Sequence, residues 1–261
     1  MLGALCDLAK DQKRPSDTEI VFAGLVDEES GQAGSRALAA TGLKADLAIV
    51  GEPTRLKAVT AHKGVLWLRL ETYGKAAHGA RPELGKNAIH AMARIVEVLE
   101  TDYATRLRRR RHPLLGNATI NVGAIHGGKQ PNIVPDRCAI QIDRRTLPGE
   151  NNKEVISEIK QFLAQQQLAV QIQSLQAGPC SPLETAPEQA LVQQLLRSLG
   201  QKSPCAVDYF SDAGVLAEAG IPSVLFGPGD IAQAHTPEEW IALEQLERSK
   251  LMLGKFFRKL A

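Results

Sequence analysis

The sequence is poor in cysteine and aromatic residues and contains no long apolar run. Its four cysteines, Cys6, Cys138, Cys180 and Cys205, are scattered along 261 residues without the C-x-x-C spacing of a zinc knuckle or redox pair. We therefore expect reduced thiols. No segment approaches the roughly 18 apolar residues of a membrane span, and the opening MLGALCDLAKDQKR lacks the basic start and apolar core of a signal peptide. These features predict a cytoplasmic protein with no membrane partner.

Neither sign of charge dominates the chain. The 31 Lys+Arg residues face 29 Asp+Glu residues, which gives a formal net charge of +2 at pH 7. The basic run Arg106 to His112 (RLRRRRH) has no interleaved aromatic residues and follows a predicted helix, so we interpret it as a solvated loop. The near-equal numbers of basic and acidic residues give no electrostatic reason for nucleic acid to bind, and we predict no nucleic-acid partner.

Three almost continuously apolar runs lie near the two ends of the sequence. Residues 20–26 (IVFAGLV), 45–53 (ADLAIVGEP) and 221–229 (IPSVLFGPG) resemble strands of a parallel sheet that is covered on both faces. A helix is predicted between the first two runs, with a start at residues 30–34 and a stop at Gly42. Further helices are predicted near the start of the chain and around the last run. The pattern therefore predicts an α/β domain with a three-layer, mostly parallel sheet.

The middle of the chain has a different pattern, in which apolar and polar residues alternate. Segments 64–74, 117–128, 137–148 and 168–176 read as strands, and 87–100 and 153–166 read as amphipathic helices. The order β-α-β-β-α-β is the ferredoxin-like split motif. We predict an inserted domain at 59–177 that interrupts a domain made of 1–58 and 178–261. The strand 64–73 is expected at an exposed edge, where a second copy of the chain would pair with it.

Acidic residues and a histidine follow the predicted strands. Glu29 ends the first run within the acidic triplet Asp27, Glu28 and Glu29, Glu52 ends the second, and His235 follows the third. The carboxyl ends of strands are where open α/β sheets collect ligands. Two carboxylates and an imidazole suit Zn²⁺, with Mn²⁺ or Co²⁺ as alternatives. Taken singly, a Glu pair is usually solvated surface, G-E-P a turn, and a histidine before Thr-Pro a neighbour of a helix cap.

The motifs together resemble those of a known enzyme family. The stretches DEESG, VGEPT, AHGARPELGKNAI, NIVPD with DRRTLPGE, and GPGDIAQAHTPEEWI are similar to those of the di-zinc deacylases and metallopeptidases. That family contains acetylornithine deacetylase, succinyl-diaminopimelate desuccinylase, aminoacylase and the glutamate-releasing carboxypeptidases. The resemblance implies a zinc-dependent hydrolase of linear amide bonds with two zinc ions per site. Its substrates would be N-acyl amino acids, with dipeptides as the alternative.

The resemblance also implies a role for each matching residue. Glu28 matches the general base, Glu29 and His235 match ligands of one zinc, and Glu52 matches a ligand of the other. His78 matches a histidine that stabilises the oxyanion, often from the partner subunit of a dimer. Asn132 and Arg145 match positions that hold the substrate carboxylate or the oxyanion. Three plainer readings stay open: His78 as a polar loop residue, Asn132 as a turn former, and Arg145 as a member of a surface ion pair.

Two motifs of the family's active site are not found among the 261 residues. The family uses a histidine from an H-x-D motif and an aspartate that bridges both metals, and neither has a counterpart here. The start of the chain resembles the helix that follows that aspartate. We therefore expect an N-terminally shortened member of the family. Two hypotheses stay open for its function: an amide hydrolase, or a noncatalytic binding or dimerisation module.

The absent ligands lead to a first prediction. A protein consisting of these 261 residues should hydrolyse N-acetyl amino acids and dipeptides at a negligible rate even with excess zinc, because Glu29, His235 and Glu52 hold too little of the metal site to activate water. Turnover assays with and without a chelator measure this. Strong, chelator-sensitive hydrolysis would contradict the prediction and would assign the missing positions to other residues, such as Asp27 or Asp212.

Overall fold

A computed structural model describes residues 1–11 and 15–260 of the chain. It divides into two compact units: unit 1 comprises Met1–His62 and Leu183–Ala261, and unit 2 comprises Lys63–Pro182. Within the described ranges, no helix combines the length and the apolar character that a membrane crossing requires. All four cysteines are free thiols, as expected.

Unit 1 is built around a mixed sheet of five short strands. These are β1 (Ala48–Val50), β2 (Val59–His62), β9 (Leu183–Glu184), β10 (Cys205–Val207) and β11 (Ser223–Leu225), in the order β1-β11-β2-β10 with β9 also paired to β2. The β1–β11 and β2–β10 pairs are parallel, whereas β11–β2 and β2–β9 are antiparallel. Parallel and antiparallel pairings are thus mixed where a mostly parallel sheet was expected, because continuous apolar runs report burial on both faces and carry no information about strand direction.

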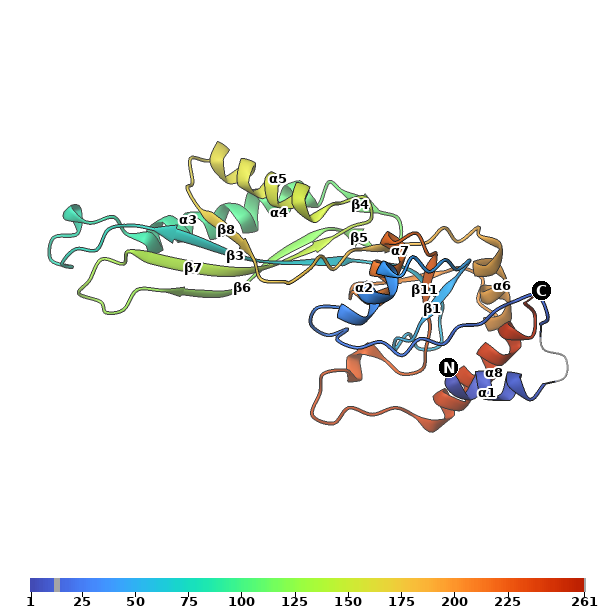
Figure 1. Ribbon diagram of the computed structural model, residues 1–261. Helices are drawn as coiled ribbons and strands as arrows, with labels where there is room; N and C mark the ends of the chain where they lie inside the picture. The colour runs from blue at the N-terminus through green and yellow to red at the C-terminus, as the bar shows by residue number, and fades with distance from the viewer. Residues whose placement is uncertain (12–14, 261) are drawn as a thin grey trace. The chain divides into compact units, whose positions relative to one another are not determined.

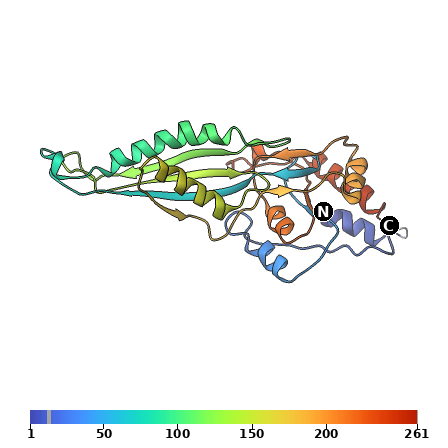
Figure 2. The ribbon, with the colours of Figure 1, turned by 90° about the horizontal axis from the view of Figure 1, so that it is seen from above.

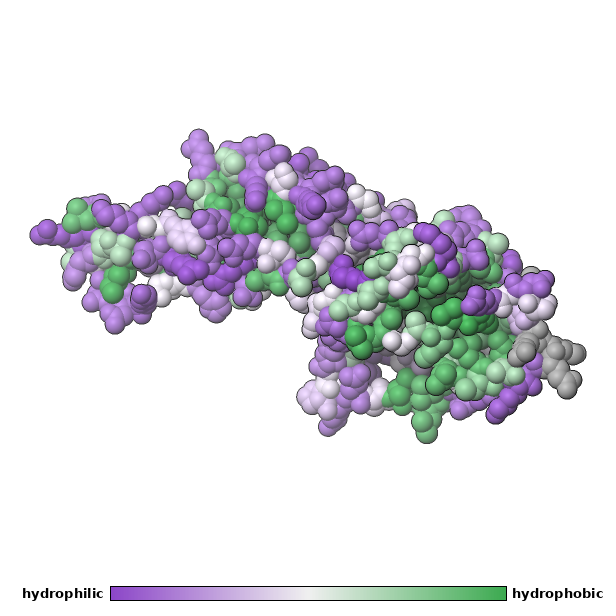
Figure 3. Space-filling view, in the orientation of Figure 1, coloured by the Kyte–Doolittle hydropathy of each residue, from purple (hydrophilic) through white to green (hydrophobic). Residues whose placement is uncertain are grey.

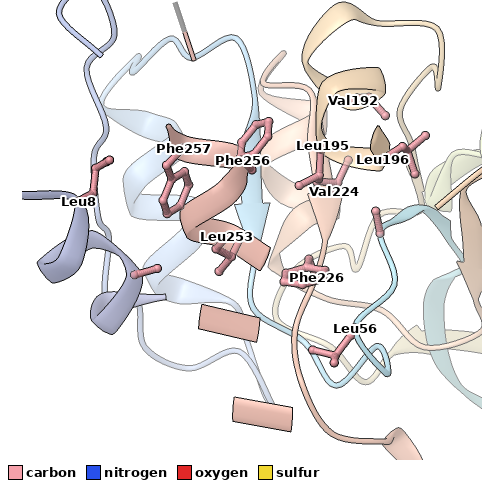
Figure 4. Close-up of a cluster of buried hydrophobic side chains, with 12 residues drawn as sticks. Leu8, Leu56, Val192, Leu195, Leu196, Val224, Phe226, Leu253, Phe256 and Phe257 are labelled. Atoms are coloured by element: carbon pink, nitrogen blue, oxygen red, sulfur yellow. The ribbon is translucent and has the colours of Figure 1, made fainter. Parts of the chain in front are cut away.

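Helices flank this sheet and form the main core of the unit. They are α1 (Leu2–Ala9), α2 (Ala33–Ala40), α6 (Ala190–Leu199), α7 (Asp212–Glu218) and α8 (Leu243–Phe257), with a short 3₁₀ turn, η3 (Ile231–Gln233). Helices α1 and α8 lie side by side (Figure 1). Figure 4 shows their side chains meeting those of α6 and β11 in one buried cluster, which includes Leu8, Leu195, Phe226, Leu253 and Phe256. This core supports the loops that carry the acidic residues.

The predicted strand at residues 20–26 is wrong. The segment has no strand assignment, and no strand pairs with it within the part of the chain that the structure describes. Its apolar side chains are largely exposed, including Val21 at 59%, Phe22 at 52% and Val26 at 69%. Hydrophobic residues gather on one face of unit 1 in Figure 3. An apolar run becomes a strand only where a neighbouring backbone completes its hydrogen bonds, and composition cannot supply that neighbour.

Unit 2 has the predicted β-α-β-β-α-β order. Its sheet contains β3 (Gly64–Tyr73), β6 (Thr119–Gly127), β7 (Arg137–Thr146) and β8 (Gln171–Ser174), and its main helices are α3 (Ala88–Val98) and α5 (Asn152–Gln165). Both helices lie on the same face of the sheet (Figures 1 and 2). Shorter elements are η1 (Pro82–Leu84), η2 (Leu99–Tyr103), α4 (Ala104–Leu107), β4 (Arg111–His112) and β5 (Gly116–Asn117).

The expectation that strand 64–73 lies at a sheet edge is wrong. The strand order is β6-β7-β3-β8, and β3 pairs antiparallel with β7 over its whole length and with β8 over Leu68–Glu71. Its backbone is therefore engaged on both sides over that stretch. The edges of the sheet are β6 and β8. Alternation of polar and apolar residues shows that one face of a strand is buried. Central and edge strands of such a sheet both have one buried face, so the alternation does not distinguish them.

The arginine run is more ordered than a solvated loop. Arg110 donates from its two terminal nitrogens to Glu150 at 2.9 Å and to Glu158 at 2.7 Å. Arg144, whose side chain is 0% exposed, pairs with the same Glu150 at 2.6 Å. The run thus contributes to a network of ion pairs inside unit 2, and this use of Arg110 was not foreseen from the sequence.

Candidate metal and acid-base site

The acidic triplet lies on a closed loop between residue 26 and helix α2. The Gly34 N–H donates to the Val26 carbonyl at 3.1 Å, and the Gln32 N–H donates to the Asp27 carbonyl at 2.7 Å. A Cβ at Gly34 would lie 2.5 Å from the Val26 nitrogen, so only glycine permits this approach. The loop therefore has a defined conformation although it contains no regular structure.

Asp27 stabilises the loop through its side chain. Its Oδ2 accepts the N–H groups of Gly31 at 3.1 Å and Ala33 at 3.3 Å, and its own φ of 67° places it in the left-handed region. The first acidic residue of the triplet is therefore committed to the backbone at the start of α2. Glu28 and Glu29 extend from the same loop.

Glu29 lies against His235, which comes from the loop after η3. The Nε2 atom of His235 is 3.0 Å from Oε1 of Glu29, and the hydrogen bond to Glu29 raises the pKa of His235. Two ligand atoms bound to one tetrahedral Zn²⁺ lie about 3.3 Å apart, given bonds of about 2.0–2.1 Å. The spacing of this pair therefore suits two ligands of one cation. Both side chains are more than two-thirds exposed, at 70% and 74%, so a ligand has access to them.

Glu28 and Glu52 have pKa values far above the usual range of a carboxyl group. Burial, together with the charges of Glu29 and Asp212, raises the pKa of Glu28 to about 7. Burial and the charges of Glu28, Asp212 and Glu29 raise the pKa of Glu52, which follows β1, to about 8. Like charges at this end of the sheet therefore oppose one another, and a cation or a shared proton would relieve that repulsion.

Asp212, which the sequence suggested only as a residue that could take a missing ligand position, is a fourth member of this acidic group. It lies at the start of α7, is 6% exposed, and contributes to the raised pKa values of both Glu28 and Glu52. The signal in the sequence was the Ser211-Asp212 pair, which is typical of a helix start but does not point to a site. Tyr209 is a further neighbour: burial and the charge of Glu52 raise its pKa, and its hydroxyl donates to the Pro53 carbonyl at 3.4 Å.

The donor set fits a cation only in part. Among residues 1–11 and 15–260, no three His, Cys, Asp or Glu side chains are arranged to hold a metal ion. Glu29 and His235 lie within hydrogen-bonding distance of each other, and the charge of Glu29 also contributes to the raised pKa of Glu52. The described residues thus supply one pair of side chains at a spacing that suits two ligands, in acidic surroundings that would favour a cation.

The remaining predicted site residues lie in unit 2. The loops of His78 and Asn132 are joined by backbone hydrogen bonds, from Gly79 N–H to the Asn132 carbonyl at 2.7 Å and from Val134 N–H to the Ala77 carbonyl at 2.9 Å. The His78 Nδ1 accepts the Ala80 N–H at 3.1 Å, which leaves Nε2 as the outer ring nitrogen. The structure thus brings His78 and Asn132 together on neighbouring loops.

Arg145 lies on β7 and is engaged in an ion pair. Its Nε and one terminal nitrogen each lie 3.0 Å from an oxygen of Asp143, in a bidentate arrangement. Asp143 also accepts from the Trp67 indole at 3.2 Å. A substrate carboxylate would have to compete with Asp143 for this guanidinium group.

Comparisons with known proteins agree with both units. The family described as "Peptidase dimerisation domain" matches residues 60–171, which covers most of unit 2. The chain is 34% identical over 238 residues to the acetylornithine deacetylase of Myxococcus xanthus, and 35% identical over 235 residues to that of Edwardsiella ictaluri. These matches cover 88% and 87% of the chain, and 62% and 60% of the relatives. The chain belongs to the M20 peptidase family.

Solved peptidase structures share the fold of the chain. The aminopeptidase PepT of Bacillus cereus superposes with a TM-score of 0.70 at 24% identity, over 90% of this chain and 62% of that one. An M20 family metallo-carboxypeptidase of Sulfolobus solfataricus superposes with a TM-score of 0.64 at 19% identity, over 86% and 66%. The predicted α/β fold with a dimerisation domain is thereby confirmed. This M20 chain spans about 60% of the length of the curated relatives named above.

The raised pKa of Glu52 predicts how stability depends on pH. Because the folded state holds the Glu52 proton up to about pH 8 and the unfolded state releases it near 4.5, the folded state binds more protons between these values. The free energy of unfolding should therefore fall as pH rises through this window. Glu52→Gln, which mimics the neutral acid, should make the metal-free protein more stable than wild type at pH 8 and change little at pH 4.5.

Urea denaturation in the presence of a chelator measures this effect at both pH values. Glu188→Gln removes an exposed carboxyl outside the acidic group and controls for the loss of one charge. A Glu52→Gln protein that is less stable than wild type at pH 8 would show that the carboxylate has a favourable partner in the folded state.

Proposed function

We propose that this chain carries the proton-transfer group and part of the metal site of a hydrolase that cleaves linear amide bonds. The observation that carries the proposal is the contact between Glu29 and His235 beside a second carboxyl, Glu28, whose pKa is raised to about 7. A general base works best when its pKa lies near the working pH, and Glu28 meets that condition. The acetylornithine deacetylase relatives support N-acyl amino acids as the substrate class.

Glu29 and His235 would hold one divalent cation, and Glu52 would serve a second. When bound, a cation such as Zn²⁺ lowers the pKa of water and polarises an amide carbonyl. In this proposal the cations are two zinc ions, with cobalt or manganese as substitutes. Each ligand must lose its proton to bind metal, so the raised pKa values of Glu52 and His235 imply that affinity increases with pH.

Glu28 would move the proton between water and the leaving amine. It lies on the same closed loop as Glu29, and its partly buried carboxyl is protonated or ionised with little cost near neutral pH. In unit 2, His78 would donate a hydrogen bond to the oxyanion, and Asn132 and Arg145 would hold the oxyanion or the carboxylate of the substrate. A cytoplasmic location remains part of the proposal.

A second function is a noncatalytic binding or dimerisation module. The observation that favours it is that the described residues contain no group of three metal-binding side chains. A panel of N-acetyl amino acids and dipeptides, assayed with a protein that contains this chain together with the remaining M20 ligands, separates deacetylase from dipeptidase activity. Hydrolysis of neither class would favour the module.

The division of roles between Glu28 and Glu29 leads to a prediction about metal binding. In residues 1–261, Glu29→Ala and His235→Ala should each weaken Co²⁺ binding about tenfold or more, because each removes a ligand. Glu28→Gln should leave Co²⁺ affinity nearly unchanged. In a protein that contains this chain together with the remaining M20 ligands, the same Glu28→Gln change should lower turnover about 10²-fold or more, because the base is lost.

Titration with Co²⁺, followed by visible absorption, compares the three variants directly. Equal loss of Co²⁺ binding in all three would show that Glu28 is a ligand and that the proposed division is wrong. Unchanged binding in the Glu29 and His235 variants would show that this pair does not hold the metal.

We further propose that unit 2 mediates a homodimer through β6. The family name of the unit supports self-association. Strand β6 is an edge strand of nine residues, whereas the other edge strand, β8, has only four. Ile125 on β6 is 53% exposed. A long edge strand offers a longer row of backbone groups for pairing with a second copy.

Sedimentation of the wild type and two variants tests this surface. The wild type should be a dimer at micromolar concentration, and Ile125→Lys should shift it towards monomer by placing a charge at the β6 edge. Leu175→Lys, a matched change at an exposed residue that directly follows β8, should remain dimeric. A monomeric wild type, or a stronger effect of Leu175→Lys, would contradict the assignment.

A further inference from the structure

The carboxylate of Asp212 is tied to the far end of the acidic loop. Its Oδ1 accepts the hydroxyl of Ser35 at 2.6 Å and the side-chain amide of Gln32 at 3.4 Å. All three side chains are buried, with exposures of 6% for Asp212, 0% for Ser35 and 1% for Gln32. Hydrogen bonds to a buried, charged acceptor are the stronger kind, so this is a firm attachment between α7 and the start of α2.

Asp212 is itself fixed to the central sheet. The preceding residue, Ser211, accepts the Ala213 N–H at 3.2 Å as the cap of α7. The Ser211 hydroxyl also lies 3.1 Å from Nε2 of His62, a fully buried residue of β2. A continuous set of hydrogen bonds thus leads from the sheet to α7 and from α7 to the loop.

The loop needs an attachment at this end. Gln32 has a left-handed backbone with φ of 55°, a conformation that is unfavourable for residues other than glycine and persists only where the surrounding structure holds it. At the other end of the loop, Asp27 binds the N–H groups of Gly31 and Ala33. Glu28 and Glu29 lie between these two attachments, so their positions depend on both.

We propose that Asp212 is a positioning residue, which holds the Glu28–Glu29 loop in place through Ser35 and Gln32. The effect of Asp212 on cation binding by Glu29 and His235 rests on the proposed function. Its effect on the position of the loop does not. Asp212 lies 177 residues from Ser35 in the sequence, so this attachment exists only in the folded unit.

The charge of Asp212 and its hydrogen bonds are separable by substitution. Asp212→Asn removes the charge but keeps an oxygen that accepts from Ser35 and Gln32. Asp212→Ala removes both, whereas Ser35→Ala removes the 2.6 Å hydrogen bond and leaves Asp212 intact. Asp46→Asn, at an exposed position of the same unit, controls for the loss of one carboxylate.

Two measurements on residues 1–261 test the proposal. Amide hydrogen exchange reports on the N–H groups of Gly31, Gln32 and Ala33, which are hydrogen-bonded inside the loop. Titration with Co²⁺ alone, followed by visible absorption, reports on the Glu29–His235 pair. Ser35→Ala and Asp212→Ala should speed exchange at these amides and weaken Co²⁺ binding about tenfold, the usual cost of losing a group that orients metal ligands.

Asp212→Asn should keep the slow exchange and the Co²⁺ affinity of the wild type, because it keeps the accepting oxygen. Asp46→Asn should also match the wild type. Unchanged exchange in Ser35→Ala would overturn the proposal, and so would an Asp212→Asn protein as impaired as Asp212→Ala. If Asp212→Ala does not fold, as judged by its thermal melt, Ser35→Ala decides. If the wild type binds no Co²⁺, the proposed metal site fails, while the exchange data still decide whether Asp212 positions the loop.

Discussion

The mutual repulsion of carboxylates at one end of the unit 1 sheet is the constraint on which the site depends. The charges of Glu29 and Asp212 both act on the carboxyl groups of Glu28 and Glu52. Glu29 has His235 as a partner, and Asp212 has Ser35 and Gln32. Burial, together with the neighbouring carboxylate charges, raises the pKa of Glu28 to about 7 and that of Glu52 to about 8. A bound cation would relieve the same repulsion, which is why a metal site and a proton-transfer group are compatible explanations of one arrangement.

The rest of unit 1 holds these charges against their repulsion. The sheet fixes Glu52 through β1 and His62 through β2, and the apolar cluster of α1, α6, α8 and β11 supports the sheet. The acidic loop itself contains no regular structure and depends on the close approach of Gly34 to residue 26 and on the side chain of Asp27. The Asp27 hydrogen bonds are exposed, whereas those of Asp212 to Ser35 and Gln32 are buried, where an unpaired polar group is costly.

Unit 2 is organised by a different principle. Its antiparallel sheet is covered by α3 and α5, and an ion-pair network of Arg110, Arg144, Glu150 and Glu158 lies within the unit. The loops of His78 and Asn132 are bound to each other by backbone hydrogen bonds and therefore form one structural feature. The family match to a dimerisation domain covers this unit, so self-association and the oxyanion donors of the proposed function would both depend on it.

The sequence by itself determined the α/β class, the β-α-β-β-α-β order, most helices and three of the acidic residues that gather in unit 1, namely Glu28, Glu29 and Glu52. These follow from periodicity, from helix stop signals such as Gly42, and from motifs in which Glu28, Glu52 and His235 stand beside glycine and proline. Only the tertiary structure decided that residues 20–26 form no strand, that β3 is central, and that Arg110 is paired. It alone showed Asp212 bonded to Ser35. Strand pairing, burial and charge contacts depend on residues far apart in the chain, and local patterns contain no information about which distant groups will meet.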